Sequence, residues 1–151
     1  RESLLGSLFE RLTGVPLVFT WQGAVVAAAV ASFPYVVRTA RAAFEDVESS
    51  VREAAHIDGA TRVQQFLFVL LPLARRGIAA GLALAFARAL GEFGATLMVA
   101  GNIPGRTQTM PIAIYDAVQA GRGEVATLLV AVLTLVALAV LLLVGRLGAS
   151  P

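Results

Sequence analysis

The stretch from Glu53 to Pro72 reads EAAHIDGATRVQQFLFVLLP and lies between long apolar runs. Its first half carries two acids, a histidine and an arginine, and its second half is apolar. Gly59 interrupts residues that favour helices, so we expect two short helices that meet at a turn. Glycine at that turn would adopt a positive φ or allow another backbone to approach closely. The residues after the turn have the helical spacing of three and four that leads an apolar face into a membrane: Val63, Phe66, Leu67, Leu70 and Leu71.

The composition is that of a membrane protein. Hydrophobic residues make up 58% of the 151 residues and charged residues 15%, and the mean hydropathy is +0.79. The chain has no cysteine, which excludes disulfides and thiolate metal sites. It also has no lysine, which excludes a glycine-rich phosphate loop with its lysine. The net charge of +2 is small and is not gathered in one patch, so we expect no nucleic-acid partner.

Three apolar runs are long enough to be membrane spans, and we expect the lipid bilayer to surround them. A spanning helix needs about 20 apolar residues. The predicted spans are about 21–40, 76–100 and 124–145, within a single all-α domain of residues 1–151. The last run is free of charge, whereas the second contains Arg88 and Glu92.

The arginines orient these spans. Six arginines lie between residues 38 and 76, and only two lie between the second and third spans. The positive-inside rule therefore predicts that the polar segment 42–73 is cytoplasmic. Residues 101–123 would then form an external loop with a short helix that begins after Thr109 and ends at Gly121.

Arg88 and Glu92 are four residues apart on a helix face that consists mostly of small residues, so they can pair with each other. One interpretation is that the charges line a transport pathway, where Arg88 would favour an anion. The other is a self-neutralising pair that fixes helix packing, and we prefer it because pairing is the usual fate of intramembrane charges. The candidate pathway or gate residues are Ser32, Arg88, Glu92 and Thr96.

The opening stretch resembles a known signature. The pattern EAA, three residues, Gly, nine residues, an aliphatic residue, any residue and Leu-Pro is that of ABC importer permeases; Val69 stands where isoleucine is most common. In that family the segment is a coupling helix that docks in a cleft of the ATP-hydrolysing subunit. His56 stands without the partners of a metal site, and we expect no metal. The resemblance assigns ATPase docking to Glu53, Ala54, Ala55, His56, Asp58, Gly59, Ala60 and Arg62.

Further stretches are similar to the molybdate branch of the oxyanion permeases, which is close to the sulfate and tungstate branches. They are GEFGAT from Gly91, AGNIPG from Ala100, RTQTMPIAIY from Arg106, SFPYVVR from Ser32, and LPL…GI…G from Leu71. The resemblance implies a permease subunit that carries molybdate or a related oxyanion into the cytoplasm. The alternatives are a sulfate, thiosulfate or tungstate permease of the same family.

The resemblance also implies a MetI-like permease fold in a bacterial or archaeal plasma membrane. The expected partners are a dimer of ATPase subunits, a second permease copy and an extracytoplasmic oxyanion-binding protein. ATP and Mg would be bound by the ATPase, so this chain would be no enzyme and would hold no cofactor. Family members usually have five or six spans, and three are present here, so we expect the chain to be a C-terminal portion. The rival classes are a non-transporting scaffold that recruits a soluble partner, and a secondary transporter that couples ions through Arg88 and Glu92.

Overall fold

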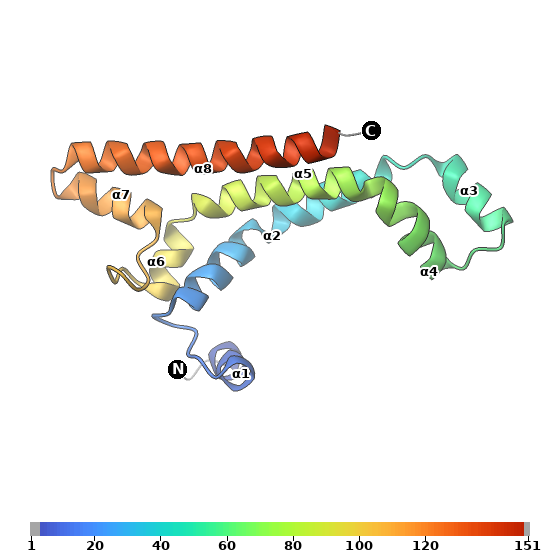
Figure 1. The fold of residues 1–151 in the computed structure, drawn as a ribbon. Coiled ribbons are helices and arrows are strands. Elements are labelled where there is room, and N and C mark those ends of the chain that lie inside the picture. The colour runs from blue at the N-terminus through green and yellow to red at the C-terminus, as the bar shows by residue number, and fades with distance from the viewer. Residues whose placement is uncertain (1–3, 150–151) are drawn as a thin grey trace. The chain divides into compact units, whose positions relative to one another are not determined.

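The computed structural model describes residues 4–149, and every regular element in that range is a helix (Figure 1). This confirms the predicted all-α class. The helices are α1 (Leu4–Thr13), α2 (Trp21–Glu45), α3 (Ser49–Ile57), α4 (Arg62–Gln64), the π-helical segment η1 (Gln65–Leu70), α5 (Leu71–Leu90), α6 (Gly94–Ala100), α7 (Met110–Gln119) and α8 (Gly123–Ala149).

Three helical stretches are long and apolar enough to cross a membrane, which confirms the predicted number of spans. They are Trp21–Glu45, Arg62–Leu90 and Gly123–Arg146. None of the most apolar window of the third stretch is buried inside the protein. A helix that is apolar on every side and unburied along this window suits a lipid environment.

The chain divides into two compact units. The first runs up to Ser32 and resumes from Ala87 to Ala139, and the second comprises Phe33–Phe86 and the chain from Val140 onward. The long helices α2, α5 and α8 each contribute one part to each unit.

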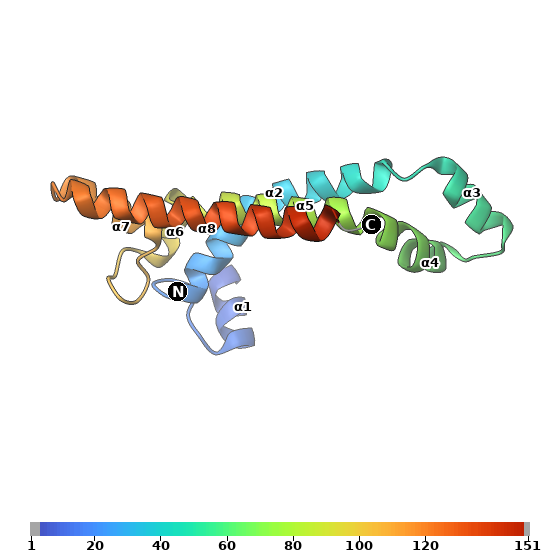
Figure 2. The same ribbon diagram turned by 45° about the horizontal axis from the view of Figure 1, so that its top comes forward.

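In the second unit, α2 and α5 lie side by side, as the two views in Figures 1 and 2 agree. Glycine makes this contact close. A Cβ atom on Gly81 would stand 2.0 Å from Oγ1 of Thr39, and that hydroxyl is held in place because it donates to the carbonyl of Tyr35 at 2.8 Å. A side chain at residue 81 would therefore push the two helices apart.

The second unit also contains the hairpin formed by α3, α4 and η1. α3 contacts η1, and the ring of Phe66 in η1 packs against that of Phe44 near the end of α2, with 5.6 Å between the centroids. The hairpin is thus attached to the end of a spanning helix through an aromatic contact.

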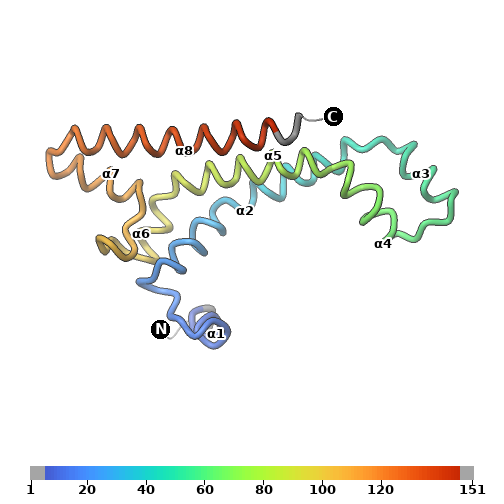
Figure 3. The backbone as a smooth tube through the Cα atoms, in the orientation of Figure 1, coloured from blue at the N-terminus to red at the C-terminus, as the bar shows by residue number. Residues whose placement is uncertain are grey.

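In the first unit, the helical backbone is interrupted between α5 and α6, as the tube in Figure 3 shows. α5 ends at Leu90, the next three residues leave the helix, and α6 begins at Gly94. The second predicted span, about 76–100, is therefore not one continuous helix. Its composition favoured a helix throughout, but polar contacts of Glu92, described below, stabilise the break.

The loop before α7 is held by its own polar groups. The carbonyl of Ile103 accepts from the N–H groups of Arg106, Thr107 and Gln108 at 2.9–3.1 Å. The side-chain amides of Asn102 and Gln108 donate to the carboxylate of Asp116 in α7 at 2.7 and 2.9 Å. α7 itself begins at Met110 and is followed by Gly121 at a φ of 68°, which confirms the predicted short helix.

Phe19 is the only non-glycine residue with a positive φ in the part of the chain that the structure describes, at 60°. Such a conformation costs a bulky residue about 1–3 kcal/mol and persists only where the surroundings impose it. The segment between α1 and α2 therefore stores strain.

Candidate functional site

The first candidate site is the hairpin of α3 and α4 in the second unit. Gly59 forms its turn with a φ of 80°, which confirms the predicted positive φ. The N–H of Ala60 donates to the carbonyl of Ala55 at 3.1 Å, and that of Gly59 donates to the carbonyl of His56 at 3.0 Å. These two bonds form a Schellman motif, which ends a helix through a left-handed residue.

A capping box starts the next helix directly after the turn. The N–H of Thr61 donates to Oε1 of Gln64 at 2.8 Å, and the N–H of Gln64 donates to Oγ1 of Thr61 at 3.4 Å. The amide of Gln65 adds a bond to the carbonyl of Ala60 at 2.9 Å. The threonine and the glutamine three residues later are the sequence signature of this motif, so the pattern at 61–64 could have predicted it.

The structure brings all the predicted docking residues together on this hairpin. None of the residues of α3, α4 or η1 is buried. Ala55 and Ala60 are half-buried, and the remaining six are exposed: Glu53, Ala54, His56, Asp58, Gly59 and Arg62. Glu53, Asp58 and Arg62 form no ion pair with any other described residue. Ile57, at the end of α3, is 84% exposed.

This surface is suited to a protein partner. A large aliphatic side chain that is almost fully exposed, flanked by charges without an internal partner, gains most when it enters a cleft of complementary charge. The turn at Gly59 and the capping box at Thr61 fix the shape of the hairpin, so little order remains to be gained on binding.

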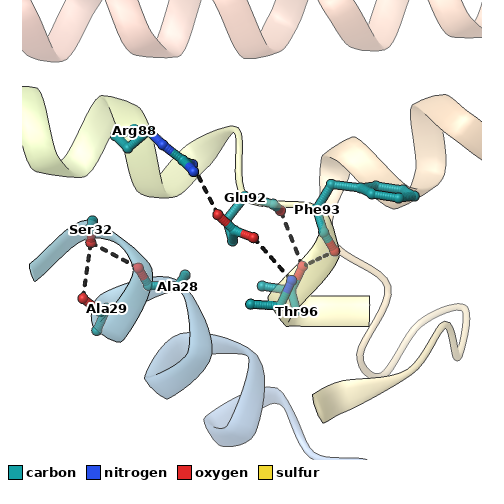
Figure 4. A network of polar contacts seen from close by, with 8 residues as sticks. Ala28, Ala29, Ser32, Arg88, Glu92, Phe93 and Thr96 are labelled. Carbon is teal, nitrogen blue, oxygen red and sulfur yellow. Dashed lines mark hydrogen bonds and ion pairs between the residues drawn. The ribbon is translucent and has the colours of Figure 1, made fainter. Parts of the chain in front are cut away.

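The second candidate site is the polar network around Glu92 in the first unit (Figure 4). Glu92 lies in the break between α5 and α6 and is only 8% exposed. One carboxylate oxygen, Oε2, accepts from Nη1 of Arg88 at 2.9 Å, and the other, Oε1, accepts from the N–H of Ala95 at 3.0 Å. The carboxylate therefore connects the last turn of α5 to the first turn of α6.

Thr96 and Ser32 use their hydroxyls locally. The hydroxyl of Thr96 donates to the carbonyls of Glu92 and Phe93 at 3.1 and 2.9 Å, and that of Ser32 donates to the carbonyls of Ala28 and Ala29. Figure 4 shows both bonds of Ser32 within α2. Of the four predicted pathway residues, the structure thus joins Arg88, Glu92 and Thr96 into one network, and Ser32 bonds only to its own helix.

A cavity of about 240 Å³ lies beside this network, lined by Glu92, Thr96 and Thr109 among mainly apolar side chains. Within the described residues, Oγ1 of Thr109 is buried without a hydrogen-bond partner. A carboxylate and apolar walls do not favour an anion. The geometry therefore indicates that Glu92 stabilises the junction of α5 and α6. The pathway role of the four residues stays a prediction.

Sequence reasoning missed two features of the first unit. The network of Asn102, Gln108 and Asp116 joins residues up to 14 positions apart. No local sequence pattern predicts these hydrogen bonds. The positive φ of Phe19 had no signal either, because phenylalanine is not a residue that favours this conformation. Among residues 4–149, no three acidic or histidine side chains gather in a way that could hold a metal ion.

Together, the fold and the two sites define a class: an α-helical membrane protein that crosses the bilayer several times and carries a structured polar hairpin between two of its apolar helices. Comparison with known proteins gives the family. Residues 9–148 match the family described as binding-protein-dependent transport system inner membrane component, and the chain belongs to this family. It is accordingly an inner-membrane protein.

Individual relatives carry related names. The chain is 46% identical over 124 residues to the molybdenum transport system permease protein ModB of Escherichia coli strain K12, which covers 82% of this chain and 54% of that protein. It is 41% identical to ModB of Haemophilus influenzae over the same shares. It is 42% identical over 105 residues to the sulfate transport system permease protein CysT of Salmonella typhimurium, which covers 70% of this chain and 38% of that protein. The chain thus spans about half the length of the molybdenum permeases that it matches.

Proposed function

We propose that the chain is part of the membrane permease of an ATP-driven importer that moves molybdate, or a related oxyanion, into the cytoplasm. The main support is its similarity to two molybdenum permeases over 82% of the chain. A sulfate permease is similar over 70% of the chain, so sulfate is the second candidate substrate. Tungstate and thiosulfate belong to the same chemical class of tetrahedral oxyanions.

The hairpin of α3 and α4 is the docking element for an ATPase subunit in this proposal. The exposed Ile57 enters a cleft on the ATPase, and the charges of Glu53, Asp58 and Arg62 meet complementary groups at its rim. Closure of two ATPase subunits around ATP pushes on this hairpin and shifts the attached spans. ATP and Mg belong to the ATPase, and the permease performs no chemistry.

The proposal includes two further partners, and membership of the family supports it. A second permease copy completes the pathway, and a soluble oxyanion-binding protein delivers substrate at the face opposite the ATPase. The arginine-rich segment 38–76 supports a cytoplasmic hairpin, which leaves the loop 101–123 on the side of the binding protein.

The substrate is tested in proteoliposomes that contain the complete transporter with its ATPase and binding protein. We expect ATP-dependent uptake of labelled molybdate that excess molybdate or tungstate blocks and sulfate does not. Uptake blocked equally by sulfate would move the assignment to the sulfate branch. The absence of ATP-dependent uptake from an assembled complex would contradict the importer proposal.

The docking element is tested by substituting Ile57→Asp, which places a charge where an apolar contact is proposed. We expect the variant permease to lose co-purification of the ATPase while it still inserts in the membrane. Val63→Asp is the matched control, because Val63 is 66% exposed on the adjacent helix and is not one of the predicted docking residues. Undiminished ATPase binding by the Ile57→Asp variant would contradict the proposed contact.

A further inference from the structure

The strained residue Phe19 joins two elements of the first unit. Its N–H donates to the carbonyl of Val99, in the last turn of α6, at 3.0 Å. The carbonyls of a last helical turn have no partner within the helix, so this bond satisfies one of them from outside. Phe19 therefore caps the C-terminal end of α6 from the segment that enters α2.

The ring of Phe19 contacts the same end of α6. A Cβ atom built on Gly101 would stand 3.0 and 3.1 Å from two carbon atoms of that ring. Gly101 follows α6 with a φ of 72°, a conformation that glycine adopts without strain. The ring thus lies directly over the residue that ends α6, where no side chain separates the two.

The entering segment is in turn fixed on α2. The carbonyl oxygen of Leu17 lies 1.9 Å from the position that a Cβ atom on Gly23 would occupy. The chain from Leu17 to Phe19 therefore rests against the first turn of α2 while it bonds to the end of α6. Phe19 spans a junction between two helices, and its positive φ is what this geometry demands.

α6 is consequently held at both ends. At its start, the carboxylate of Glu92 accepts from the N–H of Ala95; at its end, Phe19 binds the carbonyl of Val99. One side of α6 is buried between these ends, with Thr96 2% and Ala100 0% exposed, whereas Met98 is 85% exposed. The contact at the start is a charge-assisted hydrogen bond, whereas the contact at the end depends on a residue with a strained φ. We therefore expect the end of α6 to open more readily.

We propose that Phe19 is a positioning residue: a strained clasp that keeps the C-terminal end of α6 packed against the entry of α2 and releases it during the transport cycle. Strain of this kind persists at elements that switch between two arrangements. The link to transport rests on the proposed function, but the clasp itself can be measured without transport activity.

The sequence contains no cysteine. A single introduced cysteine is therefore the only site in this chain that a maleimide can label. A single cysteine replaces Ala100, which is 0% exposed in α6, and in a second protein Ala117, which is 2% exposed in α7. The rate at which a water-soluble maleimide labels each cysteine is measured in the detergent-purified complete permease. The first site reports the opening of α6, and the second reports general loosening of the unit.

We expect Phe19→Ala to raise the labelling rate at residue 100 by about tenfold, because the closed state loses its ring contact, and to leave residue 117 unchanged. Phe19→Tyr keeps the ring and should label like the wild type. Trp21→Ala is the matched control, since Trp21 has the same exposed fraction of 61% and an ordinary helical backbone. An unchanged rate at residue 100, or an equal rise at both sites, would overturn the clasp.

A second variant tests the same contact independently, in case Phe19→Ala does not fold. Gly101→Ala adds a methyl group against the ring of Phe19 and strains a positive φ, so it should raise labelling at residue 100 from the other side of the contact. Labelling is then repeated in the complete transporter with ATP and vanadate. A rise in the wild type that is absent from Phe19→Ala connects the clasp with the cycle, and no change on adding nucleotide refutes that connection.

These outcomes separate the clasp from the importer proposal. A transporter without ATP-dependent oxyanion uptake would refute the proposed function while the labelling rates still decide whether Phe19 holds α6. Normal uptake with unchanged labelling in the variants would refute the clasp alone.

Discussion

Two arginine–glutamate pairs in this chain have the same spacing and opposite surroundings. Arg41 and Glu45 lie 2.7 Å apart with side chains that are 78% and 62% exposed. Arg88 and Glu92 lie 2.9 Å apart, and the Glu92 side chain is only 9% exposed. Exposed pairs contribute little to stability. Removal of a buried carboxylate, in contrast, leaves its hydrogen-bond donors without an acceptor. The surroundings of the pair, rather than its spacing, set its importance.

We therefore predict that Glu92→Ala destabilises the folded permease by about 1–3 kcal/mol, because the N–H of Ala95 and the guanidinium of Arg88 lose their acceptor in partly buried bonds. Glu92→Gln should cost less, because its amide oxygen still accepts from Ala95. The measurement is the thermal unfolding midpoint of the purified permease. Glu45→Ala serves as the control and should leave the midpoint unchanged. Equal effects of Glu92→Ala and Glu45→Ala would show that the cap at α6 contributes nothing.

Gly81 is the second residue at which a single group decides packing. Gly81→Ala would place a methyl group 2.0 Å from the held hydroxyl oxygen of Thr39, which is a steric clash. We predict a loss of about 1–3 kcal/mol in stability from this overpacking, measured by the same unfolding midpoint. Gly145→Ala in α8 is the matched control, since nothing lies within 4 Å of its added carbon. Thr39→Gly should partly rescue Gly81→Ala, and failure of this rescue would contradict the assigned clash.

At the scale of elements, the α3–α4 hairpin is a defined shape rather than a flexible loop. A Schellman motif ends α3 and a capping box starts α4 within three residues. Gly59 is required at the turn for its φ of 80° rather than for close packing, because nothing lies within 4 Å of a Cβ atom built there.

Gly59→Pro should uncouple ATP hydrolysis from uptake, since proline cannot adopt a φ of 80° and removes the N–H that bonds to His56. Gly59→Asn should retain most coupling, because asparagine tolerates the left-handed region. The ratio of oxyanion uptake to ATP hydrolysis in proteoliposomes measures this. Coupled transport at the wild-type ratio in the Gly59→Pro variant would argue against a docking role for the hairpin.

At the scale of the whole molecule, the distribution of arginine predicts which side of the membrane each connecting segment faces. Arg62 on the hairpin and Arg106 in the loop before α7 are both exposed, so single cysteines at these positions would be accessible to reagents. The two positions are predicted to lie on opposite sides of the membrane, so they form a matched pair for a labelling comparison.

We predict that an impermeant maleimide labels Arg106→Cys in intact cells and labels Arg62→Cys only after the membrane is permeabilised. The permeabilised sample controls for intrinsic reactivity at each position. Labelling of Arg62→Cys in intact cells would reverse the proposed orientation and would also remove the hairpin from the side on which ATP is available.

The features that could be predicted from the sequence are those that depend on nearby residues. Runs of apolar residues predicted three membrane helices, and Gly59 between helix formers predicted the turn of the hairpin. The EAA signature indicated the family, because all the residues of the signature lie within one stretch of 20 residues, Glu53 to Pro72. The docking residues could be predicted as a group for the same reason, although their role in docking stays a prediction.

The tertiary structure alone decided the contacts between distant residues. It brought Gly81 against Thr39 and bent Phe19 into a strained conformation between α2 and α6. The break at Glu92 is different, because the groups that stabilise it, on Arg88 and Ala95, lie within four residues of it, yet the pattern of residue types did not predict it. Hydropathy and helix propensity sum over neighbours along the chain, so they favour a helix from residue 77 to 100 without regard to what lies beside it. The close approach at Gly81 and the strained φ of Phe19 are stable because groups far apart in sequence hold them, and only folding brings those groups together.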